Sequence, residues 1–213
     1  MQQVYLAVDI GGSSGRVVAG EFDGQKVVLE EVYRFDNGGT AANDRMYWDI
    51  LKQWDHIVTG VSAAQAKYGS RIVSLGLDTW GVDFGLLGKN DELISNPFHY
   101  RDSQLEGILE WGFERVSREE IFAQTGLQFM QINSLFQLLA LQRRESPILD
   151  FAESLLMIPD LFNWLLTGEK VNEFTNATTT QLLNPATKQW ATGLMDQFNL
   201  PSKILGEIAM PGT

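Results

Sequence analysis

The sequence predicts an α/β domain with an added helical region. Its first third alternates short apolar runs with glycine-containing turns, a pattern typical of strands joined by hairpins. Apolar residues at helical spacing follow, and then a continuous apolar run at residues 72–77 of the kind found in parallel strands. Beyond Pro97 most of the chain has helical patterning.

The opening strands are predicted at residues 4–10, 17–22 and 27–33. Asp23-Gly24 separates the second strand from the third and is typical of a two-residue hairpin turn. Consecutive strands joined in this way form an antiparallel meander.

A helix and a buried strand are expected next. Leu51, Trp54, Val58 and Val61 recur every three or four residues, so they share one face of an amphipathic helix. Gly69 is its expected C-terminal cap, because glycine adopts the left-handed backbone that ends many helices. Residues 72–77 then predict a buried parallel strand.

Shorter patterns define the rest of the chain. The predicted elements are strands at 82–87 and 93–94, a solvated helix at 102–124, helices at 135–142 and 160–166, and a polar loop at 175–180. Asn133 or Ser134 is the expected cap of the helix at 135–142. The order of three antiparallel strands, a helix and a parallel strand matches a ribonuclease-H-like α/β domain, the building block of the actin, Hsp70 and hexokinase group.

Composition excludes several classes of protein. With 44% hydrophobic and 20% charged residues, the chain is neither disordered nor collagen-like. No apolar stretch reaches the roughly 18 residues of a membrane-spanning helix, and the first residues lack the basic flank of a secretory signal.

The charge and the absence of cysteine narrow the choice further. A formal net charge of −11 disfavours nucleic-acid binding as the main function, because an acidic surface repels phosphates. Without cysteine there is no disulfide, thiolate nucleophile or cysteine-bound zinc, and two histidines are too few for a histidine-rich metal centre. A reducing cytoplasmic location is expected.

The best local signal for chemistry is Asp9-Ile10-Gly11-Gly12-Ser13-Ser14-Gly15-Arg16. Glycines in a turn between two strands let backbone N–H groups approach an anion, and serine hydroxyls add donors. Asp9 is suited to hold Mg²⁺ through water, and Arg16 to neutralise a phosphate. A glycine-rich hairpin whose aspartate bonds its own turn is the alternative interpretation.

A second signal, Asp78-Thr79-Trp80-Gly81-Val82-Asp83-Phe84, follows the predicted buried strand. Ligands of α/β folds bind at the carboxyl ends of strands. Trp80 offers an apolar wall to a sugar ring, Gly81 permits close backbone approach, and the aspartates accept from hydroxyls. Taken alone, these residues fit a tight turn with a core tryptophan slightly better than they fit a sugar site.

Weaker signals lie further along the chain. Arg101-Asp102 forms either an ion pair that fixes a loop or a donor–acceptor pair for a polyol. His99 is expected to pack in that loop rather than to act as a base. Asn133 and Gln137, one helical turn apart, are candidates to face a pocket.

Together these segments resemble the FGGY carbohydrate kinases. The resemblance rests on residues 8–17, 77–84, 100–102, 126–129, 133–138, 157–160 and 175–182, which keep the family's order across almost the whole chain. The specific strings are Asp-Thr-Trp-Gly-Val-Asp-Phe at 78–84 and Thr-Asn-Ala-Thr-Thr-Thr-Gln at 175–181. They are similar to the branch of the family that acts on L-rhamnulose.

The resemblance implies ATP-dependent phosphorylation of the 1-hydroxyl of L-rhamnulose, with ATP and Mg²⁺ as cofactors. It places Asp9 near the Mg²⁺ ion. The residues expected to face the nucleotide phosphates are Gly12, Ser13, Ser14, Gly15 and Arg16. The residues expected to contact the sugar are Gly81, carried over from the family, and Trp80, Asp83, Arg101 and Asn133.

The chain is shorter than such a kinase. FGGY kinases have two α/β domains, and the second carries the adenosine pocket and the aspartate that acts as general base. Residues 1–213 are therefore expected to be the N-terminal, sugar-binding domain, with a C-terminal kinase domain as partner. Neither Asp78 nor Asp83 matches the base, so we expect no catalytic residue here and little turnover. An exposed apolar cleft face makes a homo-oligomer possible.

Three alternatives stay open. A ribonuclease-H-like nuclease would use Asp9 and Asp78 to hold two metal ions, but it needs a basic path for nucleic acid. A non-catalytic sugar-binding module would need only this part of a kinase. A kinase for another ketose, such as fuculose or xylulose, would differ in a few pocket residues.

Overall fold

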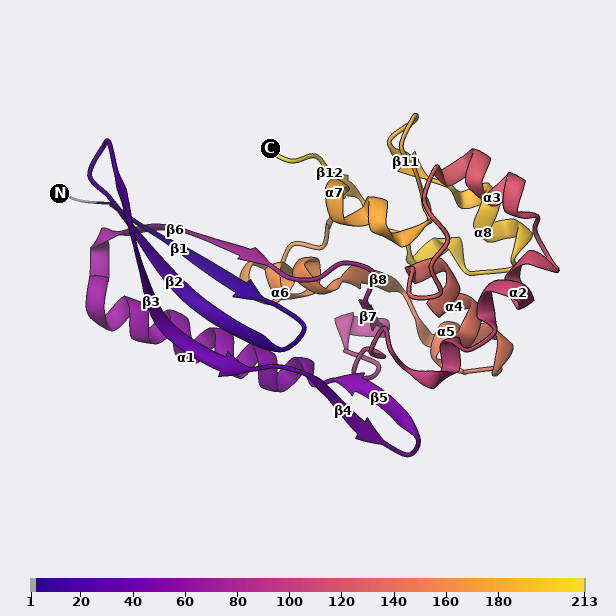
Figure 1. Ribbon diagram of the computed structural model, residues 1–213, viewed down its shortest axis with the longest axis horizontal. Helices are drawn as coiled ribbons and strands as arrows, with labels where there is room; N and C mark the ends of the chain where they lie inside the picture. The colour runs from indigo at the N-terminus through magenta and orange to yellow at the C-terminus, as the bar shows by residue number, and fades with distance from the viewer. Residues whose placement is uncertain (1–2, 213) are drawn as a thin grey trace. The chain divides into compact units, whose positions relative to one another are not determined.

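The computed structural model describes residues 3–212, which divide into two compact units (Figure 1). The sheet unit comprises Met1–Thr40 and Asp49–Trp80, and the helical unit comprises Ala41–Trp48 and Gly81–Thr213. The boundary between Trp80 and Gly81 falls inside the second predicted site, residues 78–84, so residues 78–80 belong to the sheet unit and residues 81–84 to the helical unit.

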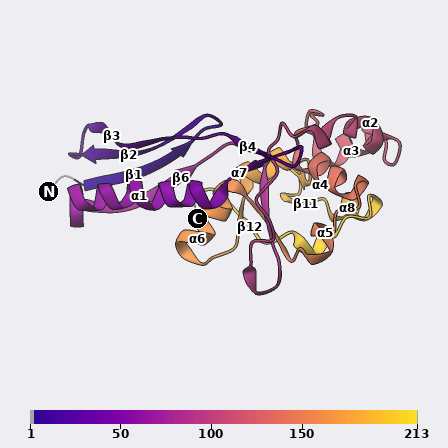
Figure 2. The same cartoon turned by 90° about the horizontal axis from the view of Figure 1, so that it is seen from below.

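The sheet unit is built on one four-stranded sheet of order β3–β2–β1–β6. Its strands are β1 (Gln3–Ile10), β2 (Ser14–Phe22), β3 (Val27–Asp36) and β6 (Ile72–Asp78). The first three form an antiparallel meander, and β6 pairs with β1 in parallel. Figure 2 shows helix α1 (Ile50–Tyr68) as a second layer along one face of this sheet. The predicted order of elements is confirmed.

Helix α1 buries a different face from the one that its apolar spacing predicts. Leu51 and Val58 are 64% and 44% exposed. The buried positions are Ile50, Gln53, Ile57, Gly60, Ala64 and Tyr68. A Cβ at Gly60 would lie 2.4 Å from Cγ2 of Val17 on β2. The helix therefore presents small residues to the sheet at close range, and this fit selects the buried face.

Two further predictions for the sheet unit are wrong in detail. Strand β6 is an edge strand with alternating exposure, not a buried one, because α1 covers only one face of the sheet. The turn between β2 and β3 has four residues instead of two, since Phe22 pairs with Val27. The Asp23 carboxylate stabilises this wider turn by accepting from the backbone N–H groups of Gln25 and Lys26.

The helical unit consists of short helices and two-stranded sheets. Its helices are α2 (Ile108–Phe113), α3 (Arg118–Thr125), α4 (Ser134–Arg143), α5 (Ile148–Phe151), α6 (Ile158–Thr167), α7 (Phe174–Ala177) and α8 (Thr192–Gln197). The strand pairs are β4 (Gly39–Ala42) with β5 (Arg45–Trp48), β7 (Phe84–Leu87) with β8 (Ser154–Met157), β9 (Asn172–Glu173) with β12 (Ile208–Ala209), and β10 (Leu183–Asn184) with β11 (Gln189–Trp190). The boundary between the two units, after Thr40, falls within strand β4.

Three predictions for this region need correction. The helix expected at 102–124 is split into a 3₁₀ turn, α2 and α3, because Gly107 takes a left-handed backbone with φ of 67° and Ser117 caps a new helix. The polar loop at 175–180 is helical, formed by α7 and the 3₁₀ turn Thr178–Thr180. The strand at 93–94 is reduced to one bridge between Leu87 and Leu93.

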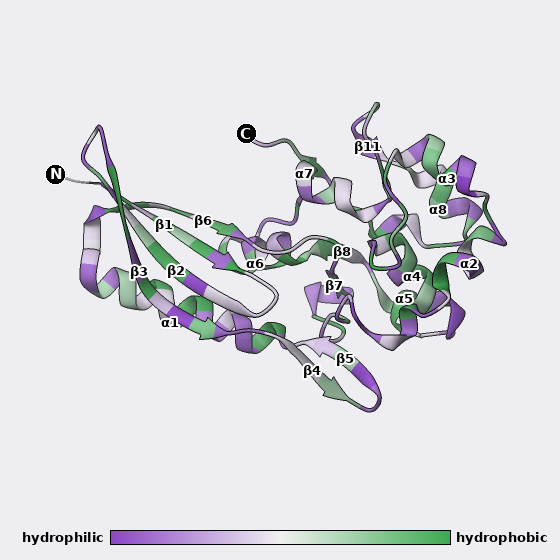
Figure 3. Cartoon of the chain, viewed as in Figure 1, coloured by the Kyte–Doolittle hydropathy of each residue, from purple (hydrophilic) through white to green (hydrophobic). Residues whose placement is uncertain are grey.

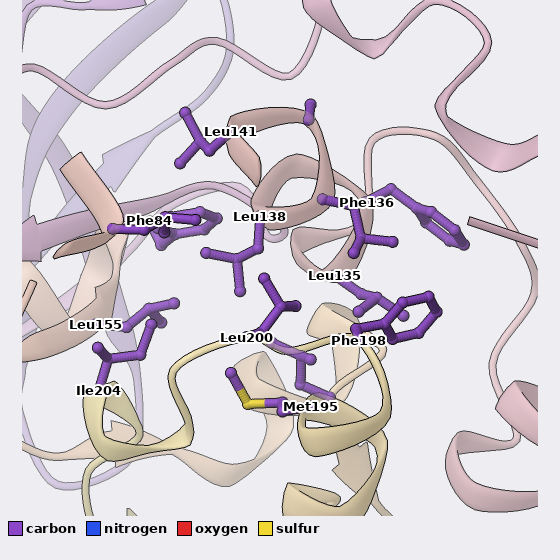
Figure 4. Close-up of a cluster of buried hydrophobic side chains, with 14 of the residues drawn as sticks. Phe84, Leu135, Phe136, Leu138, Leu141, Leu155, Met195, Phe198, Leu200 and Ile204 are labelled. Atoms are coloured by element: carbon purple, nitrogen blue, oxygen red, sulfur yellow. The ribbon is translucent and has the colours of Figure 1, made fainter. Parts of the chain in front are cut away.

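Helix α4 is at the centre of the core of the helical unit. Every residue from 134 to 141 is buried. Figure 4 shows Leu135 and Leu138 of α4 among side chains such as Phe198 and Leu200. The hydropathy colouring of Figure 3 shows green along much of α4. Within residues 3–212, no helix is both long and apolar enough to cross a membrane.

Candidate phosphate and sugar sites

The predicted phosphate segment divides between a turn and a strand. Gly11, Gly12 and Ser13 form the exposed turn between β1 and β2, and the Gly11 N–H donates to the Ser14 carbonyl at 2.8 Å. Ser14, Gly15 and Arg16 belong to β2 instead of the turn, which corrects the prediction of a single loop over these residues. The exposed backbone available to an anion is therefore centred on Gly12 and Ser13.

Asn37 holds this turn, although the sequence pattern did not single it out. Its backbone N–H donates to the Ser13 carbonyl at 3.0 Å, and its Nδ2 donates to the Gly11 carbonyl at 2.7 Å. The Asn37 Oδ1 in turn accepts from Nε2 of the buried Gln53 at 2.8 Å. Two carbonyl oxygens of the turn are thus engaged, which lowers their repulsion of an incoming anion. The available signal was an asparagine followed by Gly38-Gly39.

Gly15 is required by packing. A Cβ at this position would lie 2.2 Å from Cζ of the Phe35 ring. That ring stacks on His56 with 4.5 Å between centroids, and His56 Nδ1 is 2.9 Å from the Tyr33 hydroxyl. His56 therefore has a structural role in the packing of the sheet unit.

Asp9 and Arg16 form an exposed ion pair in the sheet unit. The Arg16 Nε and Nη2 donate to Oδ2 of Asp9 at 2.9 and 2.7 Å. The Arg16 side chain is 46% exposed and that of Asp9 is 44% exposed. Exposed ion pairs contribute only about 0–1 kcal/mol to the free energy of unfolding. Arg16 can therefore exchange its carboxylate partner for a phosphate at little cost.

Asp9 and Asp78 lie side by side at the carboxyl ends of two parallel strands, because β1 and β6 pair them in register. Mg²⁺ usually takes one or two carboxylates together with water and substrate phosphates, so this donor set fits a hydrated Mg²⁺ ion. In the described part of the chain, no group of three or more histidine or acidic residues is arranged to hold a metal. The two carboxylates therefore suit a Mg²⁺ ion that is also held by water and a polyphosphate, and not an ion held by protein ligands alone.

The predicted sugar segment in the helical unit is a tight turn at Val82. Val82 has a left-handed backbone with φ of 67°, and the Asp83 N–H donates to the Gly81 carbonyl at 2.9 Å. This is a three-residue γ-turn of the rare, strained kind. Its side-chain contacts come from Thr179 and from helix α4.

Gly81 is a glycine because Thr179 occupies the space that a side chain would need. A Cβ at Gly81 would lie 3.0 Å from Oγ1 and 3.1 Å from Cγ2 of Thr179. Trp80 precedes it at the end of the sheet-unit segment and is half-buried. Close packing explains the glycine without a ligand, so the contact of Gly81 with a sugar stays a prediction.

Asp83 is fully buried and holds the turn from inside. Its Oδ1 accepts from Gln137 Nε2 at 2.7 Å, and its Oδ2 accepts from the indole N–H of the buried Trp48. Because no part of Asp83 is exposed, its carboxylate is not accessible to a sugar in this structure, and a direct contact with the sugar stays a prediction. The role of Trp48 was not evident from the sequence, because it lies 35 residues away in the chain.

Asn133 is also fully buried. Its Nδ2 donates to the Gln128 carbonyl at 3.0 Å and to Gln181 Oε1 at 2.9 Å. Its Oδ1 is buried without a hydrogen-bond partner among the described residues. Asn133 precedes α4 as its N-cap residue, but its side chain makes no capping hydrogen bond.

Arg101 is exposed beside an open groove of about 400 Å³. Asp102 does not pair with it: the Asp102 carboxylate accepts from the backbone N–H of Met46 at 2.6 Å and lies 4.0 Å from Nη1 of Arg45. Arg101 is therefore free of this carboxylate and lies over the Tyr100 ring at 5.3 Å.

His99 packs inside this loop, as expected. Its ring is buried and stacks on Trp48 with 4.1 Å between centroids. Burial lowers its pKa, the nearby Arg101 lowers it further, and Asp102 opposes these effects. Its Nδ1 accepts from the Arg101 backbone N–H at 3.0 Å, so it is neutral and committed to the loop.

Known proteins resemble this chain in sequence and in fold. Residues 4–212 match the model of the FGGY family of carbohydrate kinases, N-terminal domain. The rhamnulokinase of Oceanobacillus iheyensis is 46% identical over 99% of this chain and 45% of its own length. That of Halalkalibacterium halodurans is 41% identical over 97% of this chain and 44% of its own length. The chain thus spans about half the length of these relatives.

Solved structures agree on the fold. A ligand-bound xylulose kinase from Lactobacillus acidophilus is 21% identical with a TM-score of 0.88, over 99% of this chain and 43% of its own. A gluconate kinase from the same organism is 20% identical with a TM-score of 0.88, over 100% of this chain and 43% of its own. The strand order and the match over residues 4–212 lead to one conclusion: the chain belongs to the FGGY family of carbohydrate kinases.

Proposed function

We propose that this chain is the sugar-binding half of an ATP-dependent kinase that converts L-rhamnulose to L-rhamnulose 1-phosphate. The observation that carries the proposal is its 46% identity, over nearly the whole chain, to a protein named rhamnulokinase. The two motifs at 78–84 and 175–181 support it further, because Thr179 of the second motif packs on Gly81 of the first. A cytoplasmic location and a C-terminal kinase domain as partner belong to this proposal, and a homo-oligomer is compatible with it.

In this reaction the oxygen of the sugar 1-hydroxyl bonds to the γ-phosphorus of ATP, and the bond from that phosphorus to the β–γ bridging oxygen breaks. ADP leaves, and the hydroxyl proton passes to a carboxylate that we assign to the C-terminal domain. Bound Mg²⁺ neutralises the phosphate charge. The N–H groups of the Gly12–Ser13 turn orient the phosphates, Arg16 pairs with them, and Asp9 supports the hydrated ion. The Gly81 turn holds the sugar, so this half contributes positioning and charge stabilisation.

Two other functions compete. A sugar-binding module without catalysis is compatible with the same turn in the helical unit and predicts binding without phosphoryl transfer. A metal-dependent nuclease would use the register pair of Asp9 and Asp78, but a net charge of −11 opposes nucleic-acid binding.

The test is calorimetric titration of the full-length product of the gene that encodes this chain, beside a coupled assay for ADP release. L-rhamnulose, L-fuculose and D-xylulose are compared under identical conditions with Mg²⁺ and ATP. Saturable binding and the highest kcat/KM for L-rhamnulose support the proposal. Binding without ADP release favours the sugar-binding module, and a higher kcat/KM for another ketose overturns the assignment of substrate.

A further inference from the structure

Val82 has a backbone conformation that its side chain disfavours. Its φ of 67° lies in the left-handed region, which glycine enters freely and β-branched residues rarely adopt. The residue is also buried, so the conformation is fixed by its surroundings and not by solvent exposure. Strained backbone of this kind persists only where neighbouring groups over-determine it, and it gathers at binding sites.

Side chains from two separate segments hold Val82. Its N–H donates to Thr179 Oγ1 at 3.1 Å. Its carbonyl accepts from Ser134 Oγ at 2.6 Å and from Gln137 Nε2 at 3.2 Å. Both backbone polar groups of Val82 are therefore fixed by side chains, one by the 3₁₀ turn Thr178–Thr180 and the other by α4.

Thr179 fixes the neighbouring Gly81 as well. Its hydroxyl accepts from the Val82 N–H and donates to the Asn176 carbonyl at 2.8 Å. Its methyl group lies 3.1 Å from the position that a Cβ at Gly81 would take. The hydroxyl sets the direction of the Val82 N–H, and the methyl limits where the Gly81 backbone can move. One side chain thus fixes two of the three residues of the turn.

We infer that Thr179 is a positioning residue for the sugar site. It holds Val82 in the left-handed conformation and thereby fixes the Gly81 backbone against which the sugar binds. This inference rests on the proposed function, because it takes the Gly81 turn to be the sugar site. Thr179 itself acts through Gly81 and Val82 and does not need to touch the substrate.

The first experiment compares Thr179→Ala, Thr179→Ser and Thr178→Ala in the full-length gene product with L-rhamnulose. Without the hydroxyl, Val82 relaxes, and the KM and the dissociation constant for the sugar rise about tenfold while kcat falls less. Thr179→Ser keeps the hydroxyl and restores most of the affinity. Thr178→Ala is the matched control, because Thr178 Oγ1 donates to the carbonyl of Thr175 in its own segment and not to the Gly81 turn. It leaves both constants within twofold of wild type.

The second experiment separates positioning from a merely structural role. In a Val82→Gly background the left-handed conformation no longer needs Thr179, so adding Thr179→Ala raises KM by less than threefold. If the role of Thr179 is merely structural, Thr179→Ala lowers the melting temperature and the active fraction equally in both backgrounds and leaves KM unchanged. An unchanged KM in Thr179→Ala, or an equal rise in both backgrounds, overturns the inference. A wild-type protein that does not bind L-rhamnulose instead overturns the proposed function, and the inference with it.

Discussion

Asp160 allows a test of how burial of charge affects the stability of the helical unit. It lies in the first turn of α6, is 2% exposed, and its Oδ1 accepts from the Glu173 N–H at 3.1 Å. Its Oδ2 is buried without a hydrogen-bond partner among the described residues. The pKa of Asp160 is raised from 3.8 to about 7, and burial is the main cause. The backbone hydrogen bond from Glu173 lowers this pKa, and the negative charge of Glu173 raises it.

The sign of the pH effect follows from proton binding. Between pH 4 and pH 7 the folded state holds a proton on Asp160 that the unfolded state has released, so the free energy of unfolding falls as the pH rises. This stabilisation is lost as the pH rises through about 7, the pKa of Asp160 in the folded state. Each pKa unit corresponds to about 1.4 kcal/mol, so a rise from 3.8 to about 7 amounts to on the order of 4 kcal/mol at most.

Asp160→Asn removes this titration while keeping the shape of the protonated acid. We expect the variant to be more stable than wild type at pH 8, and to lose most of the decrease in stability between pH 5.5 and 8. The assay is urea denaturation at both pH values. Glu153→Gln is the control, because Glu153 pairs with Lys203 at an exposed position. An unchanged pH slope in Asp160→Asn, or a variant less stable than wild type at pH 8, would show that Asp160 is not the buried group whose protonation stabilises the fold.

Three further predictions concern packing, the buried turn and the phosphate segment. Gly60→Ala should lower the free energy of unfolding by about 1–2 kcal/mol, because the clash with Val17 exceeds the gain in helix propensity. Thr59→Ala, at an exposed neighbouring position, is the control and should not lower it. Urea denaturation measures the free energy of unfolding of both variants. Trp48→Phe removes a donor to the buried Asp83 and should cost about 1–3 kcal/mol in the same assay, and no measurable loss would contradict the hydrogen bond. Arg16→Ala should weaken Mg²⁺-ATP binding about tenfold by calorimetry with less than about 1 kcal/mol of lost stability; unchanged affinity would remove Arg16 from the phosphate site.

The order of elements in the sheet unit was predictable because turns and apolar runs are local signals. The face of α1 was not, because Gly60 and Ala64 are buried by their small size while the larger Leu51 stays exposed. A scale of hydrophobicity favours Leu51, but the distance between helix and sheet is set by the small residues. How closely a helix approaches a sheet depends on the side chains of both, whereas the spacing of apolar residues along α1 describes the helix alone.

At the candidate sites too, local strings were predictable and the contacts that hold them were not. Asp9 and the turn at Gly12 were visible as a local string, and their positions at the end of β1 agree with it. The residues that hold these strings lie elsewhere in the sequence: Asn37 for the first, and Trp48 and Thr179 for the second. Such contacts join residues from about 25 to almost 100 positions apart, so spacing does not reveal them.

The most direct test of the two candidate sites is a titration of the ¹⁵N-labelled full-length gene product with L-rhamnulose, followed by NMR spectroscopy of the backbone amides. A sugar site at the Gly81 turn predicts saturable shifts at Gly81 and Val82, and a phosphate site at the Gly12–Ser13 turn predicts separate shifts at Gly12 and Ser13 when Mg²⁺-ATP is added. Saturable binding of the sugar that leaves the amides of Gly81 and Val82 unchanged would contradict a sugar site at the Gly81 turn.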